Sequence, residues 1–209
     1  MNVIPSERSQ AYFSIALPAF AFVDQDRYPL FVLSSILGGG LRSRLFRELR
    51  ERRGLVYSIG SEIHAYRDGG MLCIEGAASP EQLMTVISTT VHQLFGMLCG
   101  ELPIDEEELV SARMKLRGQH LLAAEHLNTS MSRLATQEFY FGKTLPENEI
   151  VERFGTIQAE DLERVSARLL PGLGDLAIAV TGPEKWTSEW NATLTELVEG
   201  FAELRSVNV

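Results

Sequence analysis

The hydrophobic period of this 209-residue chain changes at Gly54. Before this glycine, Leu45 and Leu49 recur with helical spacing, whereas residues 55–64 alternate with the period of a strand. A glycine at such a boundary is typical of a left-handed helix C-cap. The change predicts a helix from about residue 42 to 53, followed directly by a strand.

This strand pattern assigns Tyr57 to an apolar face. Its two faces are expected to carry Leu55, Tyr57, Ile59, Ser61 and Ile63 on one side, and Val56, Ser58, Gly60, Glu62 and His64 on the other. A tyrosine in the core is therefore its simplest interpretation. The turn signal Asp68-Gly69-Gly70 predicts that residues 71–77 return antiparallel to this strand.

Periodicity and capping signals predict the remaining elements. Further strands are expected at residues 11–17 and 176–180, and helices at residues 26–37, 80–98, 105–125, 128–141, 146–154, 159–170 and 190–204. Strands, then helices, then a late strand predict an α+β fold with a mostly antiparallel or mixed sheet covered on one face by helices. The length fits a single domain spanning residues 1–209.

Composition and charge argue against nucleic-acid and membrane partners. The net charge of −9 disfavours a broad phosphate-binding surface. The apolar stretch from Ala11 to Val23 is interrupted by Ser14 and Pro18 and is too short to span a bilayer. The N-terminus lacks the pattern of a signal peptide. We therefore expect a soluble protein, in the cytoplasm or periplasm if the source is bacterial.

Six of the nineteen basic residues are arginines between positions 42 and 53. Glu48 with Arg52, and Arg47 with Glu51, have the spacing of helical ion pairs, so part of this cluster is expected to be a solvated, charge-paired face. Arg50 has no such partner at four residues' distance.

The preceding triplet, Gly38-Gly39-Gly40, lacks the spacing of a phosphate-binding loop. A tight turn between two helices, requiring positive φ, is the simpler interpretation of these glycines.

No metal or nucleophile motif is present. Neither H-E-x-x-H nor H-x-x-E-H occurs, and His120 and His126 would be about 240° apart on one helix. There is no G-x-S-x-G, and Cys73 and Cys99 stand in apolar runs, which favours buried free thiols.

A longer pattern carries a family resemblance. The stretches LGGGLRSRLFRELRERRGLVYSIGS, LVSARMKLRGQHLL and MSRLATQEFYFGKTLPENEIVERFGTIQAEDLERVSARLL resemble, in order and spacing, the C-terminal half of the pitrilysin/insulinase family of zinc peptidases, which includes mitochondrial processing peptidase. The resemblance covers about residues 9–182.

This resemblance implies one of two similar halves that enclose a chamber. The other half carries H-x-x-E-H and a distal glutamate that hold zinc, so zinc is expected in the partner half and no cofactor in this chain. The family's R-x6-Y pair, which reaches the substrate at the zinc site, corresponds to Arg50 and Tyr57. The glycine-rich loop of heterodimeric relatives helps admit substrate, which implies substrate binding by Gly38, Gly39 and Gly40.

The leading expectation is thus a substrate-contacting, non-catalytic half of a zinc metalloendopeptidase, inactive by itself. Its partners would be a zinc-bearing half, on the same chain or on a separate subunit, and a peptide substrate, with self-association as a further expectation. A structural subunit similar to the core proteins of respiratory complexes is the first alternative. The second is an arginine-rich surface for an acidic partner, whose binding would fall steeply with added salt.

We expect this chain alone to bind no stoichiometric zinc and to hydrolyse no peptide, because its sequence offers no set of three convergent protein ligands. Metal analysis after dialysis, with a peptide-cleavage assay on the same sample, checks this. One tightly held zinc per chain that is lost on mutating His120 or His126 would contradict it.

Overall fold

The computed structural model describes the backbone of residues 1–207 and the side chains of residues 1–197. Its five strands form one sheet in the order β1-β5-β2-β4-β3. The strands are β1 (Asn2–Ser6), β2 (Ala11–Ala19), β3 (Val56–Ala65), β4 (Gly70–Ala78) and β5 (Ala177–Pro183). The longer helices are α1 (Arg27–Gly38), α2 (Leu83–Leu98), α3 (Glu106–Ala124), α4 (Leu127–Phe141), α5 (Glu147–Thr156), α6 (Ala159–Leu169) and α7 (Thr187–Val207), and a π-helix, η1 (Phe46–Arg52), precedes β3.

The sheet is mixed, as expected, because one strand pair is parallel. β2 pairs antiparallel with β4 and β5, and β4 pairs antiparallel with β3. β1 pairs parallel with β5, with Val3 opposite Val180. Sequence reasoning missed β1, whose five residues carry no clear alternation and whose partner lies at the other end of the chain.

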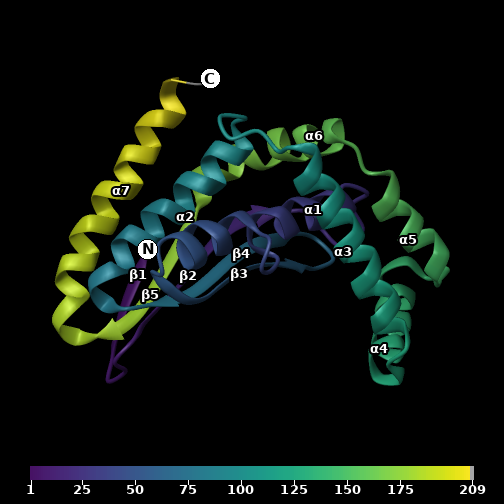
Figure 1. Cartoon of the computed structure of the whole chain (residues 1–209), viewed down its shortest axis with the longest axis horizontal. Helices are drawn as coiled ribbons and strands as arrows, with labels where there is room; N and C mark the ends of the chain where they lie inside the picture. Colours follow the sequence, from purple (N-terminus) through teal and green to yellow (C-terminus); the bar gives the residue numbers. More distant parts are fainter. Residues whose placement is uncertain (208–209) are drawn as a thin grey trace.

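One face of the sheet forms the core with the helices. Phe13, Ile15, Ile74 and Val180 point to this side and are almost fully buried. Figure 1 shows α1, α2 and α6 lying along this side of the sheet, and the apolar stripes of these helices complete the core. The prediction of a sheet covered on one face by helices is confirmed.

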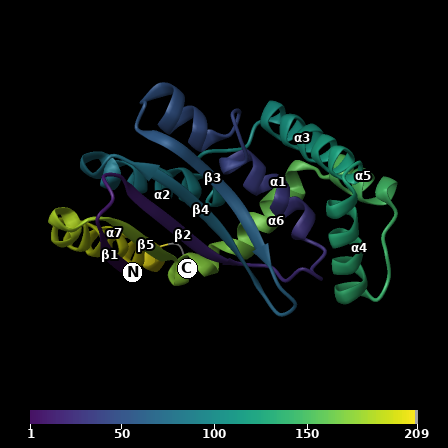
Figure 2. The same cartoon turned by 90° about the horizontal axis from the view of Figure 1, so that it is seen from below.

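No helix covers the opposite face within the described part of the chain (Figure 2). We call this surface the open face and define it by the strand residues that alternate with the core positions: Tyr12, Ser14, Ser58, Gly60, Glu62, His64, Cys73, Glu75 and Ala179. Glu62 and His64 share this face with Ser58 and Gly60, as alternation predicts, and they pair with Cys73 and Met71 of β4. A sheet of this length with one bare face has room for another molecule against it.

The helix expected from residue 42 begins later than predicted. Both the backbone N–H and the hydroxyl of Ser43 donate to the carbonyl oxygen of Gly40, at 2.9 and 2.6 Å. These bonds hold residues 40–43 in a turn, so helical structure begins at Arg44 and continues into η1 at Phe46. Gly54 ends the segment with a φ of 62°, which confirms the predicted left-handed cap.

The arginines of this segment divide between tertiary and local contacts. Arg44 donates to both carboxylate oxygens of Glu108, at 2.7 and 2.6 Å, and so ties the segment to α3. Glu48 pairs with Arg52, as expected, and also with Arg53. The expected Arg47–Glu51 pair is absent from the ion pairs of the described residues, in which Glu48 is the acid of this segment that pairs with arginines of the segment.

The glycine that ends α1 allows this helix to lie directly on β3. A Cβ added to Gly38 would stand 2.6 Å from the backbone nitrogen of Ser61. The two elements are also hydrogen-bonded here, since the hydroxyl of Ser61 donates to the carbonyl oxygen of Ser34 at 2.6 Å. Gly38 is therefore required for close helix–strand approach and not for a positive φ, which within the triplet belongs to Gly40.

We expect Gly38→Ala to lower the free energy of unfolding by about 1–3 kcal/mol, because the new methyl group forces α1 away from β3. Gly118→Ala is the matched control, since Gly118 lies inside α3 with nothing within 4 Å of an added Cβ. This control should raise stability by up to about 1 kcal/mol through helix propensity. Urea unfolding of both variants measures the difference, and equal effects would contradict the close-approach interpretation.

Candidate functional site

Tyr57 lies outside the core because β3 contains a bulge. Val56 pairs with Ala78 and Ser58 pairs with Ala77, so Tyr57 is an extra residue between two consecutive pairs. The insertion buries Val56 at 3% exposure and leaves Tyr57 73% exposed. The prediction that Tyr57 shares a face with Leu55 and Ile59 is wrong, because simple alternation does not allow for an inserted residue.

Arg50 lies against this bulge. Its Nη1 donates to the carbonyl oxygen of Val56 at 2.9 Å and to that of Tyr57. Its guanidinium carbon lies 5.7 Å from the centroid of the Tyr57 ring, within the range of a cation–π contact. The structure thus brings together the two residues of the R-x6-Y pattern at one end of β3.

The π-helix and its glycine cap set the path that makes this contact. The N–H of Leu55 donates to the carbonyl oxygen of Leu49 at 2.8 Å, and the N–H of Gly54 donates to that of Arg50 at 3.2 Å. These bonds turn the chain sharply, so that the side chain of Arg50 meets the first residues of β3. Single-turn π segments are frequent at functional sites.

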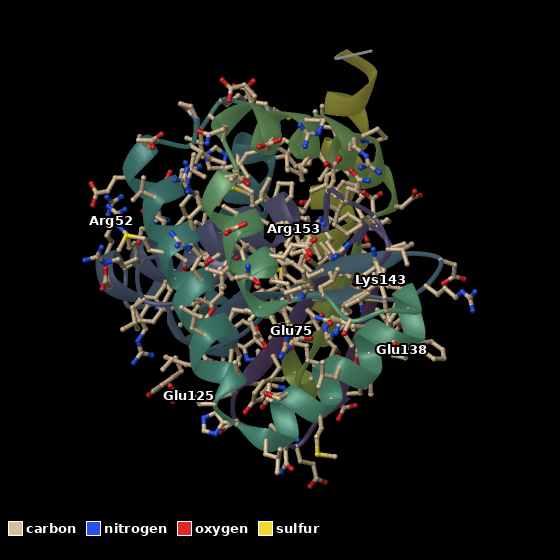
Figure 3. The ribbon with its side chains drawn as sticks, turned by 90° about the vertical axis from the view of Figure 1, so that its right-hand side faces the viewer. Arg52, Glu75, Glu125, Glu138, Lys143 and Arg153 are labelled. Atoms are coloured by element: carbon tan, nitrogen blue, oxygen red, sulfur yellow. The ribbon has the colours of Figure 1, made fainter. Side chains whose placement is uncertain are left out.

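Arg52, two residues further on, has a different environment. Its Nη1 lies 3.0 Å from Oε2 of Glu48, and its side chain is 65% exposed. Figure 3 shows Arg52 at the edge of the molecule, pointing away from its body. The two arginines therefore differ in contacts although they share one short helix.

The open face contains a hollow whose lining includes Ser58, the residue that follows Tyr57. A cavity of about 620 Å³ is lined by residues of β1 to β5, among them Tyr12, Ser14, Ser58, Glu75 and Thr181. The hydroxyl of Ser14 donates to Oε1 of Glu75 at 3.3 Å. Sequence reasoning did not identify these polar residues, because only the pairing of β2, β3, β4 and β5 brings them to one place. The sequence signal that could have indicated them is the alternation within each predicted strand, which assigns these residues to the face opposite the core.

The glycine triplet lies beyond the edge strand β3, between α1 and η1. Gly40 has a φ of 146°, so the predicted turn with positive φ is present at this glycine. Gly39 and Gly40 border a second cavity of about 470 Å³, with residues of α1 and α3 on its other walls. Gly39 and Gly40 are therefore accessible from this cavity, whereas Gly38 is buried against β3, away from the place expected for a substrate-binding residue.

The histidines do not converge on a site. His120 Nε2 lies 2.6 Å from Oε2 of Glu147, which also pairs with Arg133. His126 is the N-cap residue of α4 and so lies on a different element. Among the described residues, no group of three histidine, cysteine, aspartate or glutamate side chains could hold a metal ion.

The two cysteines differ from one another. Cys73 is buried on β4, and burial, followed by the charges of Glu75 and Glu62, raises the pKa of its thiol. Cys99 is exposed, which corrects the expectation of two buried thiols. It follows the last residue of α2, where the chain leaves the core.

The described helices were compared with the length and apolar character of a membrane-spanning helix. Within the described part of the chain, none of them combines the length and apolar character that a bilayer crossing requires.

Sequence comparisons identify similar proteins over most of the chain. The model of the "Peptidase M16 inactive domain" family matches residues 2–116. A protein of Bacillus subtilis named an uncharacterized zinc protease is 30% identical over 177 residues, which cover 85% of this chain and 42% of that protein. One of Mycobacterium bovis is 31% identical over 170 residues, covering 81% of this chain and 38% of the relative. The chain spans about two fifths of the length of these relatives.

Structural comparison gives the same fold in proteins of lower identity. The crystal structure of a peptidase M16 inactive domain from Pseudomonas fluorescens has a TM-score of 0.75 at 20% identity, covering 87% of this chain and 43% of that one. A chain of complex III2 from Candida albicans has a TM-score of 0.74 at 16% identity, covering 86% and 45%. With the family match over more than half of its length, the chain belongs to the peptidase M16 family of zinc proteases and corresponds to the family's inactive domain.

Proposed function

We propose that this chain is the substrate-contacting, non-catalytic half of a zinc metalloendopeptidase. It would act with a homologous half that carries H-x-x-E-H, on the same polypeptide or on a partner subunit, and that half would hold the zinc ion. The observation that carries the proposal is the contact between Arg50 and the exposed Tyr57 at the margin of the open face. Family membership supports the same function.

The chemistry of peptide hydrolysis suits these two side chains. Attack by zinc-activated water on a peptide carbonyl builds negative charge on its oxygen, and a nearby hydroxyl or guanidinium donor stabilises that charge. The Tyr57 hydroxyl donates to no group among the described residues, and the ring is largely exposed. It is free to donate to a bound substrate.

Most N–H donors of the Arg50 guanidinium are not used within the described residues. Only its Nη1 bonds to the chain, through the carbonyl oxygens of Val56 and Tyr57. Its Nε and Nη2 have no partner among the described residues, and the side chain is exposed. The bonded nitrogen holds the guanidinium in place, so its remaining N–H groups can contact a peptide backbone at a small entropic cost.

The open face provides the wall of the proposed chamber. Its hollow combines apolar side chains such as Ile4 and Ile59 with hydroxyl groups and the carboxylate of Glu75, and its lining includes Ser58, the residue after Tyr57. An extended peptide that contacts Arg50 and Tyr57 would lie over this surface. The glycine turn beyond β3 would then lie at the entrance to the chamber.

A non-proteolytic structural subunit is the alternative function. The shared fold of the Candida albicans complex III2 chain favours it, although a likeness at 16% identity concerns the fold alone. A structural subunit has no need for an exposed tyrosine hydroxyl beside a restrained arginine. That contact therefore favours the peptidase assignment.

We expect Tyr57→Phe to lower turnover by roughly 10²-fold in the protein that includes the zinc-bearing half, the order expected for one donor to a developing oxyanion. The substitution removes one hydroxyl that bonds to nothing among the described residues, so the urea-unfolding midpoint should not change. Steady-state kinetics on a peptide substrate, together with unfolding curves, test both expectations. Full activity of Tyr57→Phe would refute the proposed role.

Arg50→Ala should raise KM as well as lower turnover, because it removes a charge-assisted contact to the substrate backbone. It should also cost about 1 kcal/mol of stability through the bonds to Val56 and Tyr57. Arg52→Ala is the matched control on the same helix, since it removes only an exposed pair with Glu48, which keeps Arg53. Equal loss of activity in the two arginine variants would show that the helix needs positive charge and not a specific contact.

A further inference from the structure

The cavity beside the glycine turn contains a lysine without a counter-charge. Lys115 lines this space from α3, and its Nζ donates one hydrogen bond among the described residues, to the hydroxyl of Ser35 at 3.5 Å. It forms no ion pair among the described residues. Burial lowers the pKa of Lys115, and no acidic side chain offsets that effect.

The acid that borders the same cavity is already neutralised. Both carboxylate oxygens of Glu108 accept hydrogen bonds from Arg44. One of them also accepts from the backbone N–H of Asp105, at 3.2 Å, as part of the capping box of α3. The carboxylate of Glu108 is therefore occupied by these partners and forms no ion pair with Lys115.

Backbone donors and glycines complete the surroundings of Lys115. The N–H groups of Gly40, Leu41 and Arg42 donate to no acceptor within the described residues. A Cβ on Gly39 would stand 2.5 Å from Cα of Ser35 and 2.9 Å from Nζ of Lys115, and one on Gly40 would stand 3.3 Å from Nζ, so the absence of side chains at this turn leaves the ammonium close to its backbone. Successive free N–H groups beside a cation are the usual elements of an anion site.

We propose that Lys115 and the glycine turn form a subsite for a carboxylate group of a peptide. The cavity, about 470 Å³, has room for a side chain or a chain terminus. A carboxylate is the natural anion here, because the proposed substrate is a peptide and peptides carry no other common anion. The assignment of the carboxylate to the substrate rests on the proposed function, whereas binding of a carboxylate by this chain does not.

A purely structural role for Lys115 makes a different prediction. Its Nζ lies at the C-terminal end of α1, where a cation stabilises the helix dipole and where α1 has no basic residue of its own. That role alone requires the positive charge but no ligand. Binding by the isolated chain separates the two roles.

The test titrates the 209-residue chain with three short peptides and follows the amide resonances of residues 39–42. An acetylated trialanine with a free C-terminus presents a terminal carboxylate, a triglutamate amide presents side-chain carboxylates, and a triglutamine amide presents neither. We expect saturable shifts with at least one carboxylate peptide and none with the neutral one. The peptide that binds identifies the source of the carboxylate.

Variants assign the binding to Lys115. Lys115→Met keeps the length of the side chain and should weaken binding at least tenfold, as for loss of a charge-assisted hydrogen bond. Lys115→Arg should retain binding. Lys143→Met is the matched control, because Lys143 is exposed near the end of α4, on the opposite edge from Arg52 in Figure 3.

Two outcomes would overturn this subsite: binding of neither carboxylate peptide, or equal affinity in the wild-type and Lys115→Met chains. An unchanged amide spectrum outside the glycine turn guards against an unfolded variant. These measurements need no zinc-bearing half, so their failure leaves the Tyr57→Phe result untouched. A failure of the Tyr57→Phe experiment would likewise leave carboxylate binding in place.

Discussion

One inserted residue in β3 controls the geometry of the candidate site. A strand without the bulge would direct Tyr57 to the side of Ile59 and leave Val56 on the open face. With the bulge, Val56 is buried in the core and Tyr57 is exposed. Arg50 bonds to the backbone on both sides of this distortion, since its Nη1 donates to the carbonyl oxygens of Val56 and Tyr57.

The two faces of the sheet have different roles: one packs against the helical layer and forms the core, and the other is the open face. Burial of the apolar stripes of α1, α2 and α6 against one side of the sheet supplies the core, so stability does not require the other side to be covered. The residues of that other side are free to be small, polar or acidic. This division explains how the domain can fold around a complete core while one face of its sheet stays bare within the described residues.

The arginines between positions 42 and 53 form several different kinds of contact. Arg44 links the segment to α3 through Glu108. Arg52 and Arg53 share the carboxylate of Glu48 at the surface. Arg50 turns toward β3 instead. A chain of net charge −9 therefore concentrates arginines here for several separate contacts, which argues against a continuous basic surface for an acidic partner.

The amino-acid sequence by itself determined most elements and the fold class, whereas tertiary structure decided what depends on partners far apart in the chain. The helical stripes, the capping box of α3, the left-handed cap at Gly54 and the hairpin at residues 68–70 are properties of short stretches. The R-x6-Y pattern likewise identified Arg50 and Tyr57 as a pair, through the resemblance of the surrounding sequence. The parallel pairing of β1 with β5, the exposure of Tyr57 and the cluster around Glu75 follow from strand register, which residues within one strand do not specify. The environment of Lys115 depends on α3 passing the end of α1, and periodicity along a single element carries no information about such contacts.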